Sequence, residues 1–346
     1  MEPVMVDVDP SHSAPAGDAI LDVDLLAFEQ GDVAARAAVV DGVMRSLATG
    51  FVFCSQDLAG DLLDTAYGML DEFFSLPLEA KSRSSAPGSN GQTGYTGLLV
   101  ETAAAADVPD WKEMLNWGRD VPAGHPLRRR YPHQYADQVF PEAEVPGITE
   151  VLTRFHDHLA RLQQRFLRIV AVGLGAHERY FDSMVRDGAT LSRAIRYPPM
   201  SESPGGAAGA HVWAAGHGDI NLVTALPRAT ARGLQVRVGD PGTADERWID
   251  AVPPADHVVL NAGLMLERIT NGRIGAGWHR VVADPSHAGD RLSVVQFLHP
   301  TPWTVLAPLA TCVDEARPQR WAPIEAGAML DQVLYDINLV EDARRI

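Results

Sequence analysis

The stretch GHGDINLVTAL, residues 216–226, decides how the second half of this chain is interpreted. His217 and Asp219 stand two residues apart, directly before a run of apolar and β-branched residues. Side chains two apart on a strand point to the same face, so both can reach toward one point. Imidazole and carboxylate groups are good metal ligands. Because so short a pair also arises by chance, a metal site requires a third ligand from elsewhere in the chain.

Short strand-like runs surround this stretch, with turn sequences such as GDPG (239–242) and HAGD (287–290) between them. The runs are LSRAIRYPP (191–199), HVWAA (211–215), INLVTAL (220–226), GLQVRV (233–238), RWIDAV (247–252), HVVLNAG (257–263), WHRVVAD (278–284) and RLSVVQFLHP (291–300). Such a series is typical of a β-sandwich or barrel, with helices packed on its outside. We find no alternating strand–helix rhythm, no GxGxxG and no P-loop.

The first half of the chain is mostly helical in pattern. Apolar spacing predicts helices over 32–50, 61–77 and 146–187, the last in one or two pieces, and another over 326–346. Two short strands are expected at LDVDLLAF (21–28) and FVFCS (51–55). The segment KSRSSAPGSNGQTGYTG (81–97) is rich in Gly, Ser and Pro and predicts a long loop, which is a candidate lid.

Composition narrows the function classes. The chain has 346 residues, a net charge of −16 and a densest basic run of only Arg128–Arg130, which argues against nucleic-acid or membrane-surface binding. Two distant cysteines exclude a disulfide framework and fit a reducing cytoplasm. We see no signal peptide and no apolar run long enough for a membrane span. The basic residues are nearly all arginine, which suggests a GC-rich bacterial source.

A third candidate ligand lies in GWHRVVA, at His279, and RLSVVQF follows it. Two histidines and one carboxylate form the facial triad that binds non-haem Fe(II) and leaves positions open on the metal. On a strand, Arg291 and Ser293 share one face, and arginine binds carboxylates through two parallel hydrogen bonds. The residues therefore indicate a metal site with a carboxylate-binding site beside it.

The ordered motifs HGDINLVTAL, GLQVRV, VVLNAGLMLERITNGR, GWHRVV and RLSVVQF resemble the isopenicillin N synthase-like group of 2-oxoglutarate/Fe(II)-dependent dioxygenases. GFVFCS, FFSLPLEAKS and RYPP in the earlier part fit the same group. The resemblance implies a mainly β fold with flanking helices, whose core is a double-stranded β-helix (jelly roll). The acidic N-terminus, which is broken by prolines, predicts a flexible tail (1–20). After it we expect an N-terminal mixed region (21–187), the catalytic core (188–310) and a helical extension (311–346), acting as one unit.

The resemblance also assigns roles to individual residues. His217, Asp219 and His279 match the Fe(II) ligands of the group. Arg291 and Ser293 match an Arg-x-Ser pair that binds the distal carboxylate of 2-oxoglutarate, and O2 is the second cosubstrate. Tyr197 matches a tyrosine that often joins this contact. The sequence departs from the group at 218, where Gly replaces a common Thr, at Trp278 and at 220–221, and none of these changes removes a ligand.

Residues that would contact the substrate are less constrained. Strand-face arithmetic predicts Arg193, Phe297 and Asn221 as candidates, with Arg193 facing an anionic group. The resemblance adds Met114 and Asn116, because DWKEMLNWG (110–118) occupies a place where members of the group line the pocket. The implied reaction oxidises an unactivated C–H bond of a small molecule by hydroxylation, desaturation or cyclisation. A tailoring step in bacterial specialised metabolism, such as antibiotic biosynthesis, is the favoured setting. The oligomeric state stays open.

Three alternatives remain at this point. An Fe(II) oxidase of the same fold could keep Arg-x-Ser for another carboxylate and not use 2-oxoglutarate, as isopenicillin N synthase does. A non-catalytic jelly-roll binding protein would be expected to have lost a ligand, and none is lost. A zinc hydrolase could use the same three ligands, but zinc sites usually lack the Arg-x-Ser pair.

Overall fold

The computed structural model describes residues 19–57, 59–89, 91–101, 108–204, 212–239, 242–284 and 287–336. The predicted tail at 1–20 lies almost wholly outside these residues, as does the end of the predicted C-terminal helix. Across the described ranges, no helix is both long and apolar enough to cross a membrane.

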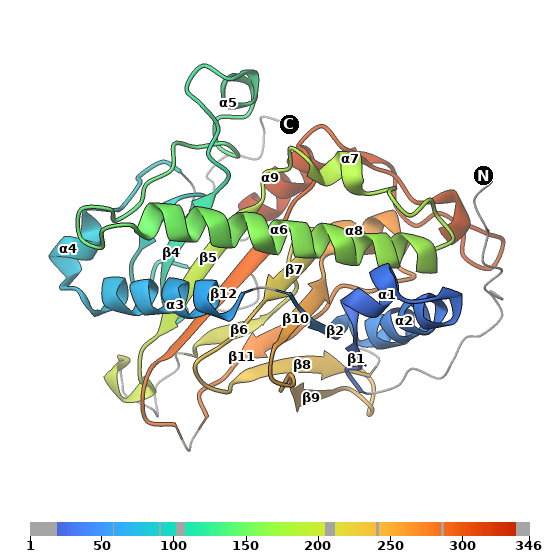
Figure 1. Ribbon diagram of the computed structural model, residues 1–346, viewed down its shortest axis with the longest axis horizontal. Helices are drawn as coiled ribbons and strands as arrows, with labels where there is room; N and C mark the ends of the chain where they lie inside the picture. Colours follow the sequence, from blue (N-terminus) through green and yellow to red (C-terminus); the bar gives the residue numbers. More distant parts are fainter. Residues whose placement is uncertain are drawn as a thin grey trace.

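Two β-sheets form the centre of the molecule (Figure 1). The larger has eight strands, in the order β1 (Asp22–Val23), β2 (Phe51–Ser55), β10 (His257–Ala262), β7 (Val223–Leu226), β12 (Arg291–Leu298), β5 (Leu191–Tyr197), β4 (Glu113–Gly118) and β3 (Gly94–Thr96). The smaller has four, in the order β6 (Ala214–His217), β11 (His279–Val281), β8 (Leu234–Val238) and β9 (Arg247–Asp250). A third pairing joins β13 (Val305–Leu306) and β14 (Ile324–Glu325). Strands β1 to β4 come from the N-terminal half, so both halves of the chain build one large sheet.

Helices cover the outer face of the large sheet. The longest, α6 (Ile148–Gly173), runs across it, with α3 (Gly60–Ser75) and α2 (Val33–Ser46) alongside (Figure 1). The others are α1 (Leu25–Gln30), α4 (Leu78–Ser82), α5 (Pro126–Arg130), α7 (Asp182–Val185), α8 (Leu264–Ile269) and α9 (Ala326–Asp336). The predicted helices over 32–50, 61–77 and 146–187 are thus present as α2, α3 and the pair α6 and α7.

The core lies in two layers, one on each face of the large sheet. Between this sheet and the helices, Leu162 and Phe166 of α6 pack with Val223 and Leu298. Between the two sheets, residues such as Ile195 and Val236 form a separate apolar cluster. The central strands are therefore covered on both faces, which explains why they read as nearly continuous apolar runs instead of alternating ones.

Strand register fixes which side chains point between the two sheets. Antiparallel pairing of β12 with β5 sets Arg291 opposite Tyr197, Ser293 opposite Ile195 and Val295 opposite Arg193. Residues two apart keep to one face of a strand, so every second side chain of both strands points the same way. This confirms the face arithmetic made from the sequence for RLSVVQF and LSRAIRY.

The prediction of one strand over 21–28 is wrong. Only Asp22–Val23 is a strand, and helix α1 begins at Leu25. The carboxylate of Asp24 accepts hydrogen bonds from the backbone N–H groups of Leu26 and Ala27, which satisfies the first turn of a helix. A capping aspartate in the middle of the apolar run is therefore what ends the strand.

Two further segments differ from expectation. The predicted loop at 81–97 begins inside α4 and ends in β3, which pairs with β4. The segment DWKEMLNWG, for which no element was predicted, supplies β4 itself as the partner of β5. Of the run 211–215, only the end belongs to β6, and residue 211 is outside the described residues.

A buried ion cluster ties α4 to strands β4 and β5. Lys81 Nζ lies 2.7 Å from Glu113 Oε2, and Arg196 Nη1 donates to Glu113 Oε1 at 2.8 Å. The hydroxyl of Tyr95 donates to the same carboxylate at 2.6 Å. Glu113 is 1% exposed, so its charge depends wholly on these partners.

We expect Glu113→Gln to lower the free energy of unfolding by about 3 kcal/mol, because it leaves the buried Lys81 without its counter-charge. Urea unfolding followed by circular dichroism measures the change. The matched control is Glu72→Gln at an exposed site, for which we expect less than about 0.5 kcal/mol. An equal effect of both substitutions would contradict a special role for the buried cluster.

Candidate active site

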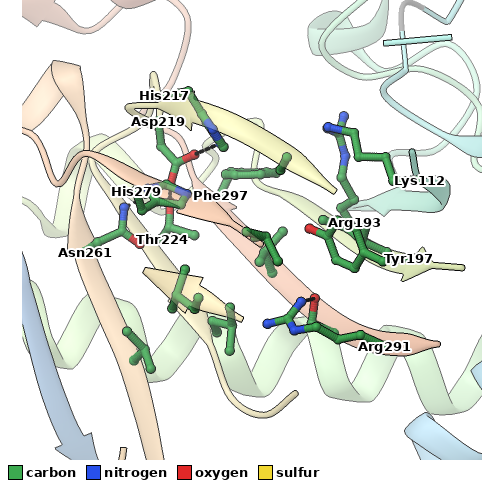
Figure 2. Close-up of a pocket in the computed structure, with 18 of the residues that line it drawn as sticks. Lys112, Arg193, Tyr197, His217, Asp219, Thr224, Asn261, His279, Arg291 and Phe297 are labelled. Carbon is green, nitrogen blue, oxygen red and sulfur yellow. Dashed lines mark hydrogen bonds and ion pairs between the residues drawn. The ribbon is translucent and has the colours of Figure 1, made fainter. Parts of the chain in front are cut away.

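A cavity opens between the two sheets, and most sequence-predicted site residues line it (Figure 2). It is lined by Phe51, Lys112, Arg193, Ile195, Tyr197, Ala214, His217, Asp219, Thr224, Leu226, Leu234, Val259, Asn261, His279, Val281, Arg291, Ser293, Val295 and Phe297. The walls are largely apolar, and the polar groups fall into three sets: a triad, a buried arginine and a pair of cations.

The triad consists of His217, Asp219 and His279. One ligand atom from each lies within 4.8 Å of the other two. His217 ends β6 and His279 begins β11, and the antiparallel register sets the two histidines directly opposite each other. Asp219 follows two residues after His217, and its Oδ1 lies 3.9 Å from Nε2 of that histidine. Strand pairing thus brings together residues that are far apart in sequence.

Backbone carbonyls orient both imidazoles. Nδ1 of His217 lies 2.8 Å from the oxygen of Ala215, and Nδ1 of His279 lies 3.1 Å from that of Gly277. A carbonyl oxygen can only accept, so each Nδ1 carries a proton, and Nε2 is the ring nitrogen that remains to bind a metal. Desolvation, with His279 adjacent, lowers the pKa of His217 to about 4, so this ring is neutral near pH 7.

Asp219 is held by one of its two oxygens. Oδ2 accepts from Thr224 Oγ1 at 2.6 Å and from Asn261 Nδ2 at 2.9 Å, which leaves Oδ1 on the side of the histidines. Burial alone would raise the pKa of Asp219, but the two imidazoles and these hydrogen bonds outweigh burial and lower it. One carboxylate oxygen and two imidazole nitrogens then face a common point, which fits a divalent transition metal.

Arg291 provides the second polar set, deep in the cavity. It is 1% exposed, and it donates from Nε to the Ala231 oxygen at 3.1 Å and from Nη1 to Ser293 Oγ at 3.0 Å. Its guanidinium lies 5.2 Å from the ring centroid of Tyr197. Burial lowers the pKa of Arg291, and no carboxylate in the described part of the chain forms an ion pair with it. A buried cation without a counter-charge is costly, so this end of the cavity suits an anion.

The five predicted substrate residues divide into two groups. Arg193 and Phe297 line the cavity, with the guanidinium 5.6 Å from the Phe297 ring centroid. Met114 and Asn221 are buried and do not line it, and Asn221 donates to the oxygen of Val223. Asn116 also lies behind the wall, where its Oδ1 accepts from Arg193 Nε at 2.7 Å.

Sequence reasoning missed Lys112, Thr224, Asn261 and Glu101, which contacts Lys112. Signals for two of them were present: Lys112 is one of only two lysines, and Asn261 interrupts the apolar run HVVLNAG. Thr224 fits an ordinary strand and carries no such signal.

Two family models match the chain. Residues 22–143 match the N-terminal region of non-haem dioxygenases in morphine synthesis, and residues 189–300 match the 2OG-Fe(II) oxygenase superfamily. A solved structure from Caulobacter crescentus, assigned to the 2OG-Fe(II) oxygenase family, is 31% identical with a TM-score of 0.76, covering 92% of this chain and 99% of that chain. The chain belongs to the 2OG-Fe(II) oxygenase superfamily.

Other relatives define the enzyme more closely. A full-length protein of Neurospora crassa, solved in complex with alpha-KG, is 25% identical with a TM-score of 0.78, over 91% of this chain and 95% of that chain. The 2-oxoglutarate-dependent dioxygenase citB of Monascus ruber is 28% identical over 76% of this chain and 79% of its own length. The protein is a 2-oxoglutarate-dependent non-haem iron dioxygenase that uses Fe(II), with 2-oxoglutarate and O2 as cosubstrates. The alternative of an oxidase that does not use 2-oxoglutarate finds no support here.

We expect Thr224→Val to weaken Fe(II) binding about tenfold, because partners that orient a ligand typically contribute about 10- to 100-fold to metal affinity. Anaerobic equilibrium dialysis with Fe(II) measures this. The matched control is Thr65→Val on the exposed face of α3, which should bind as the unmodified protein does. Unchanged affinity in Thr224→Val would show that Asp219 does not need this hydrogen bond.

Proposed function

We propose that His217, Asp219 and His279 bind the Fe(II), and that Arg291, Ser293 and Tyr197 bind 2-oxoglutarate. The observation that carries the proposal is the convergence of two imidazoles and one carboxylate within 4.8 Å, in the same cavity as a buried arginine that forms no ion pair within the described ranges. A positive iron ion complements the carboxylate of the triad, and a negative dicarboxylate complements Arg291.

When bound, the iron with 2-oxoglutarate and O2 supplies the oxidising chemistry. The protein's own groups prepare the site for it. Backbone acceptors at Nδ1 orient both histidines with Nε2 toward the metal position, and Thr224 and Asn261 hold Asp219 so that Oδ1 faces the histidines. Arg291 neutralises the far carboxylate of the cosubstrate, and the apolar wall excludes water from the reacting groups.

We infer that the two sheets form the double-stranded β-helix expected from the resemblance, with the cavity at its centre. Support comes from the cluster of apolar residues between the sheets and from the cavity that both sheets line. The proposed catalytic core, 188–310, then contains all three metal ligands, and the N-terminal region, 21–187, completes one wall through β4. The whole chain would act as one unit.

The reaction we propose is oxidation of an unactivated C–H bond in a small molecule, by hydroxylation, desaturation or cyclisation. The relatives support small-molecule substrates: the Neurospora crassa protein was also solved with thymine, and a rice relative, 29% identical over 90% of this chain and 82% of its own length, is named gibberellin 20 oxidase 3. Arg193 and Phe297 are the proposed substrate contacts, and Asn116 acts by holding Arg193. The setting in bacterial specialised metabolism and the cytoplasmic location stay predictions from composition.

The direct test of the activity is turnover of 2-oxoglutarate to succinate by Fe(II)-loaded protein in air. We expect His279→Ala to abolish this turnover while the fold, measured by circular dichroism, persists. The matched control is His133→Ala at an exposed position. Equal turnover in His279→Ala and the unmodified protein would remove this histidine from the site.

We further expect Arg291→Gln to raise the dissociation constant for 2-oxoglutarate about 10- to 100-fold, because hydrogen bonds to charged groups contribute about 1.5–3 kcal/mol each. Isothermal titration calorimetry of the anaerobic Fe(II) protein measures this. Arg45→Gln on α2 is exposed and serves as the control. An unchanged constant would mean that the cosubstrate's carboxylate binds elsewhere.

A further inference from the structure

Two cations lie side by side in the cavity, across from the triad (Figure 2). Lys112 comes directly before β4, and Arg193 lies on β5. Their side chains are 11% and 15% exposed. Neither belongs to the proposed metal or cosubstrate sites, so two nearly buried positive charges line the cavity in addition to those sites.

Each cation has one short, fixed contact. Lys112 Nζ donates to Asp110 Oδ2 at 2.8 Å, and the other oxygen of Asp110 accepts from the backbone of Ala215 at 3.2 Å. Arg193 Nε donates to Asn116 Oδ1 at 2.7 Å. These lengths are normal for charge-assisted hydrogen bonds. Both cations therefore keep their positions without any further partner.

Glu101 is held differently. Its carboxylate lies between the two cations, 3.3 Å from Lys112 Nζ, and both of its oxygens lie 3.3 Å from Arg193 Nη1. All of these contacts are longer than the roughly 2.7–2.9 Å expected for a strong charge-assisted bond. Each single contact of Glu101 is therefore longer than the contacts that Asp110 and Asn116 make with the same cations, which makes Glu101 the candidate for exchange.

Charge balance defines what could take its place. Lys112 and Arg193 carry two positive charges, and Asp110 and Glu101 carry two negative ones, so the group is neutral as it stands. Departure of Glu101 leaves one net positive charge in a nearly buried position. A single carboxylate from another molecule restores neutrality and fits the space that the Glu101 carboxylate already fills.

Protonation does not release Glu101 near neutral pH. Burial would raise its pKa, but Arg193 and Lys112 outweigh burial and lower it to about 2.

The backbone before Glu101 is strained. Glu101 follows a turn in which Leu99 adopts a left-handed conformation, φ 61°, which costs a residue with a Cβ about 1–2 kcal/mol. Such strain is usually retained where it serves a site. A competing anion is thus the natural means of displacing Glu101.

We propose that Lys112 and Arg193 bind a carboxylate group of the substrate, and that Glu101 occupies this position until the substrate replaces it. The proposal rests on the function proposed above and narrows its substrate to carboxylic acids. The carboxylate would sit on the side of the cavity away from the triad, with the body of the molecule against Phe297. Glu101 then acts as an internal competitor that keeps the cations satisfied while the cavity is empty.

The test compares two probes of the same shape, phenylacetate and its neutral analogue phenylacetamide. Binding to the anaerobic protein loaded with Fe(II) and 2-oxoglutarate is measured by calorimetry. If Glu101 is seated about nine-tenths of the time, Glu101→Gln should bind phenylacetate about tenfold more tightly than the unmodified protein. The affinity for phenylacetamide should be the same in Glu101→Gln and in the unmodified protein. Arg193→Gln and Lys112→Gln should each lose the preference for the acid.

Controls separate this proposal from the one on which it rests. Glu202→Gln, an exposed position, matches the charge change of Glu101→Gln, and Glu101→Ala checks that the effect does not depend on the amide. Failure of the unmodified protein to bind Fe(II) or 2-oxoglutarate would overturn the proposed function. Normal binding of both, with no preference of Glu101→Gln and Glu101→Ala for phenylacetate up to millimolar concentration, would overturn only the carboxylate site.

Discussion

The pairing of β6 with β11 is the constraint on which the site depends, because its register sets His217 opposite His279. A shift of one residue in either strand would turn one imidazole away from the cavity, since the side-chain period of a strand is two. The apolar residues on both strands, such as Ala214 and Val281, fix this register by packing against the large sheet. The metal centre is therefore a consequence of how the small sheet buries its apolar face.

The buried charged groups of the cavity are compensated in two ways, either by the protein itself or by a bound ligand. Asp219 is satisfied by the protein through Thr224 and Asn261, so it is rigid before any ligand arrives. Arg291 has backbone and hydroxyl acceptors but no counter-charge among the residues that the structure describes, so an anionic ligand would complete its charge balance. Lys112 and Arg193 stand between these cases, with fixed neighbours and one weakly held carboxylate. From closed to open, the order is therefore the metal ligand Asp219, then the proposed substrate cations, then the proposed cosubstrate residue Arg291.

Much of this could be predicted from the sequence because it follows from period and order. The face that carries Arg291 and Ser293 required only that residues two apart share a side of a strand, and the register of β12 with β5 agrees. The pair His217 and Asp219 was predicted on the same ground, but β6 ends at His217 and Asp219 lies beyond it. The prediction that Asn221 shares the face of His217 and Asp219 failed for the same reason. Strand β7 begins only at Val223, so Asn221 lies before it. The start of α1 depended on one capping aspartate inside an apolar run.

Other features could not be obtained from the sequence, because they depend on contacts between distant segments. Glu101 meets Arg193 across 92 positions. Neither residue lies in a motif that would predict the other. Likewise, β4 pairs with β5, but the sequence DWKEMLNWG gives no clear strand signal. Its side chains are buried on both faces of the strand, so polar and apolar residues do not alternate. Met114 and Asn116 were predicted from the resemblance alone; both lie on β4, and neither lines the cavity.

The most direct test of the central claim is the anaerobic titration of the protein with Fe(II) in the presence of 2-oxoglutarate, followed by visible absorption. Chelation of Fe(II) by the cosubstrate produces a charge-transfer band, and the account predicts that it saturates at one equivalent per chain. It also predicts that Asp219→Ala, if folded, shows no band. A band of full intensity in Asp219→Ala, or none in the unmodified protein, would contradict the account.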